Sequence, residues 1–333
     1  MTSRTRRGTR AGVVALVGAL ALGACSSSLP QAEPEAPPAV APPVLNAAQS
    51  ENILTQLGQV LGAADAALDP ALLTSRVSGP ALAIRTAEYV RATATAGAKV
   101  PTALPVTAQS SVVADTTTWP RTQLVITDQP DDLQAQRVLV LRQDSAREPY
   151  RLWGWARLGG GVQMPATADT EIGSQPIAPD DGALLLPPAD VVTQYADVLT
   201  NGDASASAAT FAPDFFRATI EGKRAESVAS VQVVGTATET YTPVGEPISL
   251  STADGGAVVV AELSTVTTLA ISQGSLTLAD PFEAALAGRS SVGKNLTRTW
   301  TDVLVFYVPP AGSPTTQVQV LAAEHALTAV TGE

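Results

Sequence analysis

The chain offers few residues whose types could carry out chemistry. It contains one cysteine, Cys25, and one histidine, His325, among 333 residues. One cysteine excludes an internal disulfide and a cysteine-based zinc site, and one histidine excludes a site built from several imidazoles. A catalytic triad would have to use His325 beside Glu324, but the sequence lacks the Gly-x-Ser-x-Gly motif that presents such a serine. We therefore expect His325 at the surface or at a pocket rim, on a strand.

Acidic and glycine-rich motifs also give no catalytic set. The adjacent pairs Asp131-Asp132 and Asp180-Asp181 each follow a proline, which predicts turns rather than two acids that face each other across a sugar. The run Gly159–Gly161 lacks the pattern and the lysine of a phosphate-binding loop. We expect no enzymatic activity and no cofactor or metal. A hydrolase whose site the sequence does not reveal stays an alternative.

Two tryptophans stand out because aromatic residues make up only 4% of the chain. Trp153 and Trp155 are two positions apart, so on a strand both would point to the same side, with Gly154 on the other. They are expected to pack under a helix in the core. The alternative is a ligand pocket, in which the pair would line a concave sheet for an apolar or sugar ligand.

Cys25 lies where a thiol has a specific use. Four arginines and no acidic residue precede an apolar stretch, Ala11–Leu22. Twelve residues are too few to cross a bilayer core, which needs roughly 20, so residues 1–24 are predicted to be a secretory signal peptide. The stretch ends in Leu22-Gly23-Ala24-Cys25. This motif resembles the lipobox of bacterial lipoproteins.

The resemblance implies lipidation of Cys25: diacylglycerol on its sulfur, cleavage before it, and a further chain such as palmitate on the new amine. Two or three acyl chains, at about 0.8 kcal/mol per buried CH₂, anchor a protein stably. The predicted location is the extracytoplasmic face of the cell membrane. Without its signal the chain has 16 basic and 31 acidic residues, a net charge of -15, which disfavours nucleic acid as a partner.

A spacer and then a helical region are predicted after the anchor. Residues 25–45 contain six prolines and no apolar period, which predicts an extended tether. Asn46 and Gln49 form a capping-box pattern before the helical spacing of Ile53–Leu68. The segment Ile53–Leu61 is similar to Val191–Leu199 at an offset of 138. This similarity predicts an internal duplication.

Strand patterns follow the helices in both parts of the chain. The runs over 122–127, 137–141 and 150–158 have counterparts over 257–271, 302–306 and 317–327. We predict an α+β fold of two tandem related domains, 46–163 and 188–333, joined by a linker over 164–187. In each domain, N-terminal helices would pack on a curved antiparallel sheet. This order resembles the NTF2-like and cystatin-like folds.

The alanine-rich, lysine-poor chain, with only Lys99, Lys223 and Lys294, is similar to uncharacterised actinobacterial surface lipoproteins that carry domains of unknown function. The leading hypothesis is a non-catalytic envelope protein, anchored through Cys25, that binds a partner protein or a small apolar ligand. The alternative is a lipid or glycolipid carrier with an apolar cavity. The third is an envelope hydrolase.

Overall fold

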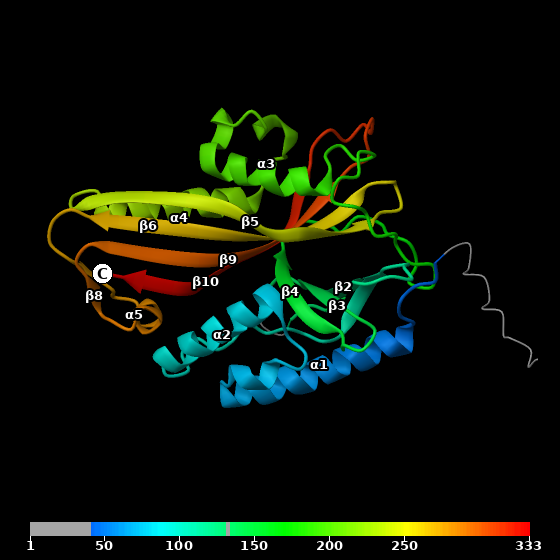
Figure 1. Cartoon of the computed structure of the whole chain (residues 1–333), viewed down its shortest axis with the longest axis horizontal. Coiled ribbons are helices and arrows are strands. Elements are labelled where there is room, and N and C mark those ends of the chain that lie inside the picture. The colour runs from blue at the N-terminus through cyan, green and yellow to red at the C-terminus, as the bar shows by residue number, and fades with distance from the viewer. Residues whose placement is uncertain (1–40, 131–133) are drawn as a thin grey trace, which may run out of the picture. The chain divides into compact units, whose positions relative to one another are not determined.

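The described part of the chain is a mixed α+β fold, as the sequence predicts. The computed structural model describes residues 41–130 and 134–333, so the predicted signal peptide, Cys25 and most of the tether lie outside it. Eight antiparallel strands form one curled sheet in the order β1-β2-β3-β4-β10-β9-β6-β5 (Figure 1). Among the described residues, no helix is both long and apolar enough to cross a membrane.

The first half of the sheet follows two helices. These are α1 (Ala47–Ala67) and α2 (Gly79–Ala94), separated by the short 3-10 helix η1 (Pro70–Leu73). Four short strands then form a meander in which each pairs with the next: β1 (Ala108–Val113), β2 (Arg121–Thr127), β3 (Arg137–Gln143) and β4 (Arg151–Leu158). Four of these seven elements match runs predicted from the sequence, whereas β1 was not predicted.

The second half repeats this order with longer strands. Helices α3 (Pro188–Asn201) and α4 (Phe215–Val231) precede strands β5 (Gly235–Ser251), β6 (Ala257–Ile271), β9 (Asn295–Val308) and β10 (Gln319–Gly332). Two short 3-10 helices, η2 (Gly202–Ala204) and η3 (Ala208–Thr210), lie between the helices. A small insertion lies between β6 and β9: strand β7 (Leu276–Thr277), helix α5 (Pro281–Ala287) and strand β8 (Ser291–Val292).

The two meanders form a single sheet because their last strands pair. In β10, Ala322 and Ala323 lie opposite Leu158 and Arg157 of β4. The predicted separate sheets are thus joined edge to edge in this structure. A resemblance to the NTF2-like or cystatin-like folds stays a prediction, as does the division into domains 46–163 and 188–333.

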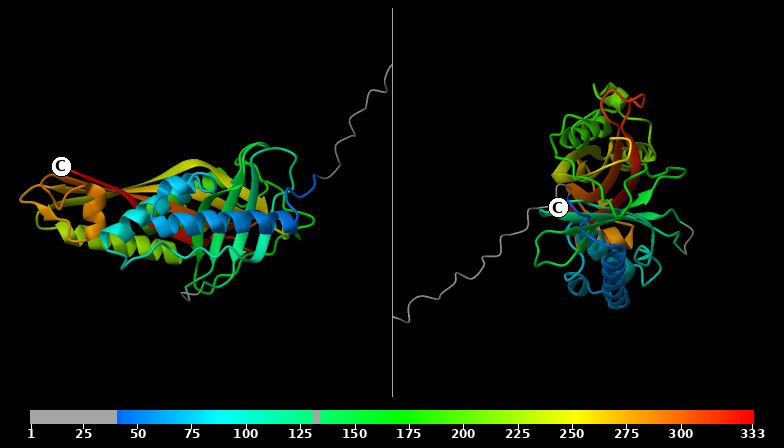
Figure 2. Two further views of the ribbon diagram at one scale, coloured as in Figure 1. Left: turned by 90° about the horizontal axis from the view of Figure 1, so that it is seen from below. Right: turned by 90° about the vertical axis from the view of Figure 1, so that its right-hand side faces the viewer.

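Helices cover the outer faces, and the two halves of the sheet pack partly on each other. Figure 2 shows α1 and α2 on one side of the sheet and α3 on the opposite side. Side chains of β6 alternate between two cores, because neighbours on a strand face opposite ways. Val258 and Val260 belong to the core of the first half, whereas Val259 packs with α3 and α4.

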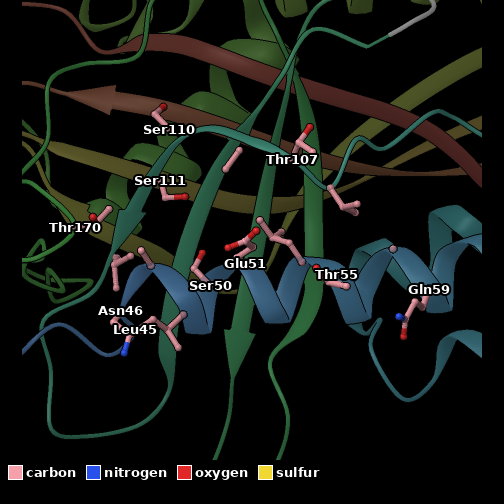
Figure 3. Close-up of a pocket in the computed structure, with 16 residues that line it drawn as sticks. Leu45, Asn46, Ser50, Glu51, Thr55, Gln59, Thr107, Ser110, Ser111 and Thr170 are labelled. Atoms are coloured by element: carbon pink, nitrogen blue, oxygen red, sulfur yellow. The ribbon is translucent and has the colours of Figure 1, made fainter.

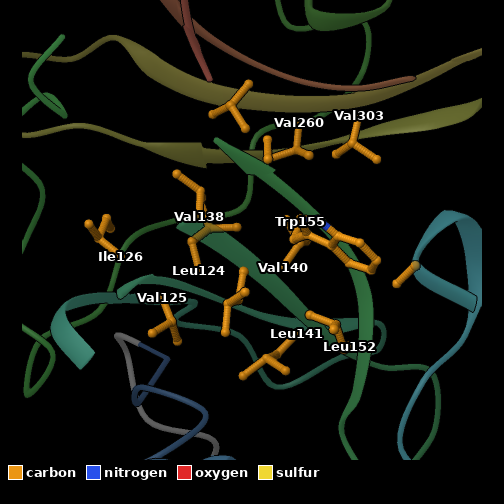
Figure 4. Packing of buried hydrophobic residues seen from close by; sticks show 14 of the residues in the cluster. Leu124, Val125, Ile126, Val138, Val140, Leu141, Leu152, Trp155, Val260 and Val303 are labelled. Atoms are coloured by element: carbon orange, nitrogen blue, oxygen red, sulfur yellow. The ribbon is translucent and has the colours of Figure 1, made fainter. Parts of the chain in front are cut away.

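Close packing between the sheet halves depends on a glycine. Figure 4 shows Val260 and Val303 of the second half lying against Val138 and Val140 of β3. A Cβ on Gly154 of β4 would lie only 3.3 Å from a methyl group of Val303. The missing side chain therefore allows β4 to approach β9 closely.

The duplicated helices keep the same buried positions. Leu54, Leu57 and Leu61 of α1 are buried, and so are the residues 138 positions later in α3, namely Val192, Tyr195 and Leu199. The match weakens in the next helix pair, where Glu88 of α2 is buried but its counterpart Glu226 of α4 is exposed. The duplication is thus clearest in the first helix of each half.

Candidate ligand groove

A groove of about 820 Å³ lies between helix α1 and the first strand of the sheet (Figure 3). Its volume falls in the range of small-molecule sites, roughly 300–1,000 Å³. Residues from the first four turns of α1, the segment 106–108, strand β1 and Thr170 line it.

The start of α1 is fixed by local hydrogen bonds. The side chain of Asn46 accepts from the backbone N–H of Gln49 at 2.9 Å, and the Gln49 side chain accepts from the N–H of Asn46 at 2.9 Å. This is the predicted capping box. On the next turn, Ser50 accepts a hydrogen bond from the Gln123 side chain of β2. These contacts hold one wall of the groove against the sheet.

The floor of the groove is apolar and its rim carries hydroxyl groups. Leu45, Leu54 and Val113 lie at the floor and are buried. Thr55 and Ser110 lie on opposite walls and are exposed. Such a surface favours an amphiphile, since apolar area gains free energy on burial while the hydroxyls satisfy polar groups.

The groove is almost free of charge. Glu51 is the one ionisable side chain among the described residues that line it. The remaining polar lining consists of hydroxyls and the amides of Asn46 and Gln59. An ionic ligand would find no opposite charge here, so the lining favours a neutral or weakly polar ligand.

A second hollow extends the groove along the same helix. It has a volume of about 520 Å³ and shares Gly58 and Val106 with the first, and it reaches Asp65 near the end of α1. A Cβ on Gly58 would lie 2.8 Å from a methyl group of Val106, so these two residues form the boundary between the hollows. At 1.5 Å per residue, the distance from Asn46 to Asp65 is about 28 Å. This length suits an extended chain.

Buried charges lie below the far end of this surface. Arg85 of α2 is 2% exposed and pairs with Asp65 at 2.6 Å and with Glu88 at 2.9 Å. Burial lowers the pKa of Arg85, but the two carboxylates more than offset this and leave its pKa raised. Across the joint between β4 and β10, Arg157 pairs with Glu324 at 2.9 Å. The pair of Arg85 with Asp65 joins α2 to α1, and the pair of Arg157 with Glu324 joins β4 to β10.

The sheet edge beside the groove is open in its central part. Within the described residues, β1 pairs with β2 alone. Its end is covered, because the carbonyl of Val113 accepts from Ser174. Backbone groups between Ala108 and Val112 therefore have no strand partner on the outer side, which leaves them able to bind another extended chain.

The structure separates the residues that the sequence singled out. Trp155 is fully buried beneath α2, with the Arg85 guanidinium 5.9 Å from its ring centre. Trp153 is half-buried, and its ring lies against Gly79 at the start of α2. Neither lines the groove, and a ligand-binding role for the pair stays a prediction. Cys25 lies outside the described residues.

The remaining candidates also lie apart from the groove. Asp180 is exposed in a turn, and Asp181 accepts from the N–H of Ala183. Asp131 and Asp132 lie outside the described residues. No cluster of three or more metal-binding side chains occurs in 41–130 and 134–333. His325 lies on β10 and is hydrogen-bonded to Asp302 of β9, a partner that the sequence analysis missed.

Fold and groove together define an α+β protein with a ligand-sized hollow along its first helix. The chain belongs to the family described as a domain of unknown function (DUF8094), whose model matches residues 41–332. This match confirms the prediction of a domain of unknown function, and it spans both halves of the sheet. No curated protein and no solved structure shows significant similarity to the chain.

Proposed function

We propose that the protein is a lipid-anchored, extracytoplasmic binding protein of an actinobacterial envelope that holds the acyl chain of a lipid or glycolipid in the groove along α1. The observation that carries this proposal is the groove itself. Its floor is apolar, its rim carries hydroxyls, and only Glu51 brings a charge to the described lining. The apolar floor would take the chain, and the hydroxyl rim would take the polar headgroup.

The proposed anchor lies close in sequence to the groove. Leu45, which lines the groove, is 20 positions after Cys25. A proline-rich segment of this length spans on the order of 60 Å when fully extended. A ligand could therefore pass between the membrane and the groove while Cys25 stays anchored. The binding protein would act by sequestering or transferring a lipid, without covalent chemistry.

Binding of an uncharged fluorescent lipid tests the groove. The chain is expressed from residue 25 with Cys25→Ala, so that it carries no acyl chain of its own. We expect a dansyl-labelled monoacylglycerol to bind with a saturable rise in fluorescence that unlabelled monopalmitoylglycerol reverses. Thr55→Trp fills the groove from α1 and should weaken binding about tenfold or more, equivalent to at least 1.4 kcal/mol.

A tryptophan elsewhere on the same helix serves as the control. Ala63 is exposed on α1 and lines neither hollow, so Ala63→Trp should bind the probe like the parent chain. Equal loss of binding in both variants, or no saturable binding by the parent chain, would contradict the proposal.

Membrane fractionation tests the anchor separately. Cys25→Ala in the full-length precursor should release the protein from membranes or leave its signal uncleaved, because the acyl chains would be missing. A fatty-acid probe supplied to growing cells should label the parent chain and leave this variant unlabelled. Unchanged processing and unchanged membrane association of Cys25→Ala would refute lipidation.

The open edge of β1 supports a second candidate, a partner protein that adds an extended segment beside Ala108–Val112. This partner would form backbone hydrogen bonds and place small side chains in the groove. Ser111→Pro removes one outward-facing backbone donor from the edge strand, because the outward side of β1 is that of Val113, two positions later. Loss of binding to peptides selected from a random library, with lipid binding retained, would favour this candidate over the lipid.

A further inference from the structure

A second pocket lies in the other half of the molecule, around the single histidine. It has a volume of about 340 Å³ and is bounded by α4, α5 and the strands β5, β6, β9 and β10. This volume is near the lower end of the range for small-molecule sites. His325 and Trp300 line it side by side. The pocket shares no lining residue with the groove along α1.

His325 is held rigidly by a buried carboxylate. Its Nδ1 lies 2.5 Å from Oδ1 of Asp302, whose side chain is fully buried. The other carboxylate oxygen, Oδ2, accepts a hydrogen bond of 2.5 Å from the hydroxyl of Thr265. Because an ionised carboxylate only accepts hydrogen bonds, Nδ1 carries the proton toward Asp302.

Two aromatic rings fix the plane of the imidazole. Trp300 stacks on it with ring centres 4.2 Å apart and an angle of 8° between the planes. Phe216 of α4 meets it edge-on at 6.0 Å. The edge that carries Nε2 is left to face the pocket. Nε2 makes no hydrogen bond with any residue in the described ranges. In the neutral imidazole, this nitrogen presents a lone pair.

The charges of the lining select against anions. Of the described residues that line the pocket, four are carboxylates: Glu226, Glu239, Asp280 and Glu283. Two are cations, and both are paired: Lys223 with Glu226 at 2.9 Å, and Arg298 with Glu283 at 2.5 Å. Glu239 is paired with Arg224, which lies outside the lining, at 3.1 Å. The carboxylate of Asp280 is therefore the excess negative charge of the described lining, and it favours a neutral or cationic ligand.

We propose that this pocket binds a small neutral or cationic molecule whose O–H or N–H group donates a hydrogen bond to Nε2 of His325. The ligand class is a small alcohol or amine. Asp302 and Thr265 are positioning residues that hold the tautomer, and Trp300 holds the ring. With an ammonium ligand, the same geometry lets Nε2 take the proton: the ligand N–H bond breaks and its electron pair stays on the now neutral amine, an Nε2–H bond forms, and Asp302 compensates the imidazolium charge.

Nuclear magnetic resonance of the single imidazole tests the proposal on the mature chain. With ¹⁵N-labelled histidine, only His325 gives ring nitrogen signals. The probe is ethanolamine, which carries a hydroxyl and an ammonium group, and acetate at the same ionic strength is the control. We expect that in the neutral ring Nδ1 is protonated and Nε2 is not. Ethanolamine should shift the Nε2 signal saturably, and acetate should not.

Two variants test whether the pair of His325 and Asp302 serves ligand binding or only stabilises the fold. Asp302→Asn replaces one of the two acceptor oxygens by an N–H donor, and it should populate the other tautomer and weaken the ethanolamine response about tenfold. Ala63→Trp, exposed on α1, should leave the response unchanged. The proposal is overturned if ethanolamine gives no saturable shift, if acetate shifts Nε2 equally, or if Nε2 carries the proton in the neutral ring.

Discussion

The two halves of the sheet share an order of elements but differ in strand length. Strands β1 to β4 contain 6–8 residues, whereas β5, β6, β9 and β10 contain 14–17. The long strands therefore extend past the pairing of β4 with β10. Their outer part has a small core of its own, which includes Leu269, Leu296 and Val330.

This difference gives each half a different hollow. In the first half, α1 lies across short strands and leaves a nearly uncharged groove beside an open edge. In the second half, α4 and α5 lie along the extended strands and enclose a charged pocket around His325. One order of helices and strands thus supports two surfaces of opposite character, because strand length decides what the helices cover.

The largest expected effect tests whether the halves are one cooperative unit. Trp155→Ala removes a fully buried side chain from the first core and should destabilise the protein by about 3–5 kcal/mol. Val303 and Val305 of the second half belong to that same core, so both halves should lose stability together. Denaturant unfolding is followed by far-ultraviolet circular dichroism and by the ring resonances of His325, the single histidine, which report on the second half.

Coincident unfolding curves from the two signals would support a single unit. Two separate transitions, with the His325 transition unchanged by Trp155→Ala, would show that the halves fold independently. That outcome would favour the predicted domains 46–163 and 188–333 despite the shared sheet.

The next effect compares two arginines. Arg85 in α2 is buried with Asp65 and Glu88, whereas Arg224 in α4 pairs with Glu239 at 3.1 Å and keeps 32% of its side chain exposed. Arg85→Met should cost about 3 kcal/mol, because it leaves Asp65 without its cation and leaves the buried Glu88 with Arg91 alone, at 3.2 Å. Arg224→Met should cost about 1 kcal/mol or less, because water screens that pair.

Urea unfolding of both variants at neutral pH measures this contrast. Equal losses would mean that the charges of the first half are as well solvated as those of the second. The ion pairs of the two helix pairs would then contribute equally to the stability of the fold.

Features set by neighbours in sequence were predictable. The capping box of Asn46 and Gln49 occurs as expected, and local signals of the same kind mark α5, which Asp280 caps at its start and Gly288 at its end. Each depends on side chains that bond to the backbone a few residues away, so the pattern is visible in the sequence. The similarity of Val191–Leu199 to Ile53–Leu61 likewise indicated which positions of the two helices are buried.

Features set by long-range pairing were not predictable. The pairing of β4 with β10 joins segments more than 160 positions apart, and no local pattern specifies it. Asp302 becomes the partner of His325 only through the register of β9 against β10. Strand β1 was missed because its sequence, Ala-Gln-Ser-Ser-Val-Val, has three polar residues among its first four. That polarity is what makes it suitable as an open edge beside the groove.

The smallest effect concerns Glu262 of β6, which lies opposite Val303. Burial, with a smaller contribution from Asp302, raises the pKa of Glu262 to about 6. The folded chain therefore holds this proton more tightly than the unfolded chain, whose pKa is about 4.3. The stability that this group contributes is fully present below about pH 4.3 and is lost as the pH rises through 6.

Glu262→Gln imitates the protonated carboxyl and should remove this loss. Its free energy of unfolding should equal that of the parent near pH 4 and exceed it near pH 7 by on the order of 1 kcal/mol, a value reduced for partial exposure. Glu246→Gln, at an exposed position of β5, controls for the change in net charge. A variant less stable than the parent near pH 7 would mean that Glu262 is held as a carboxylate, so that the inner face of the second half is more polar than its packing indicates.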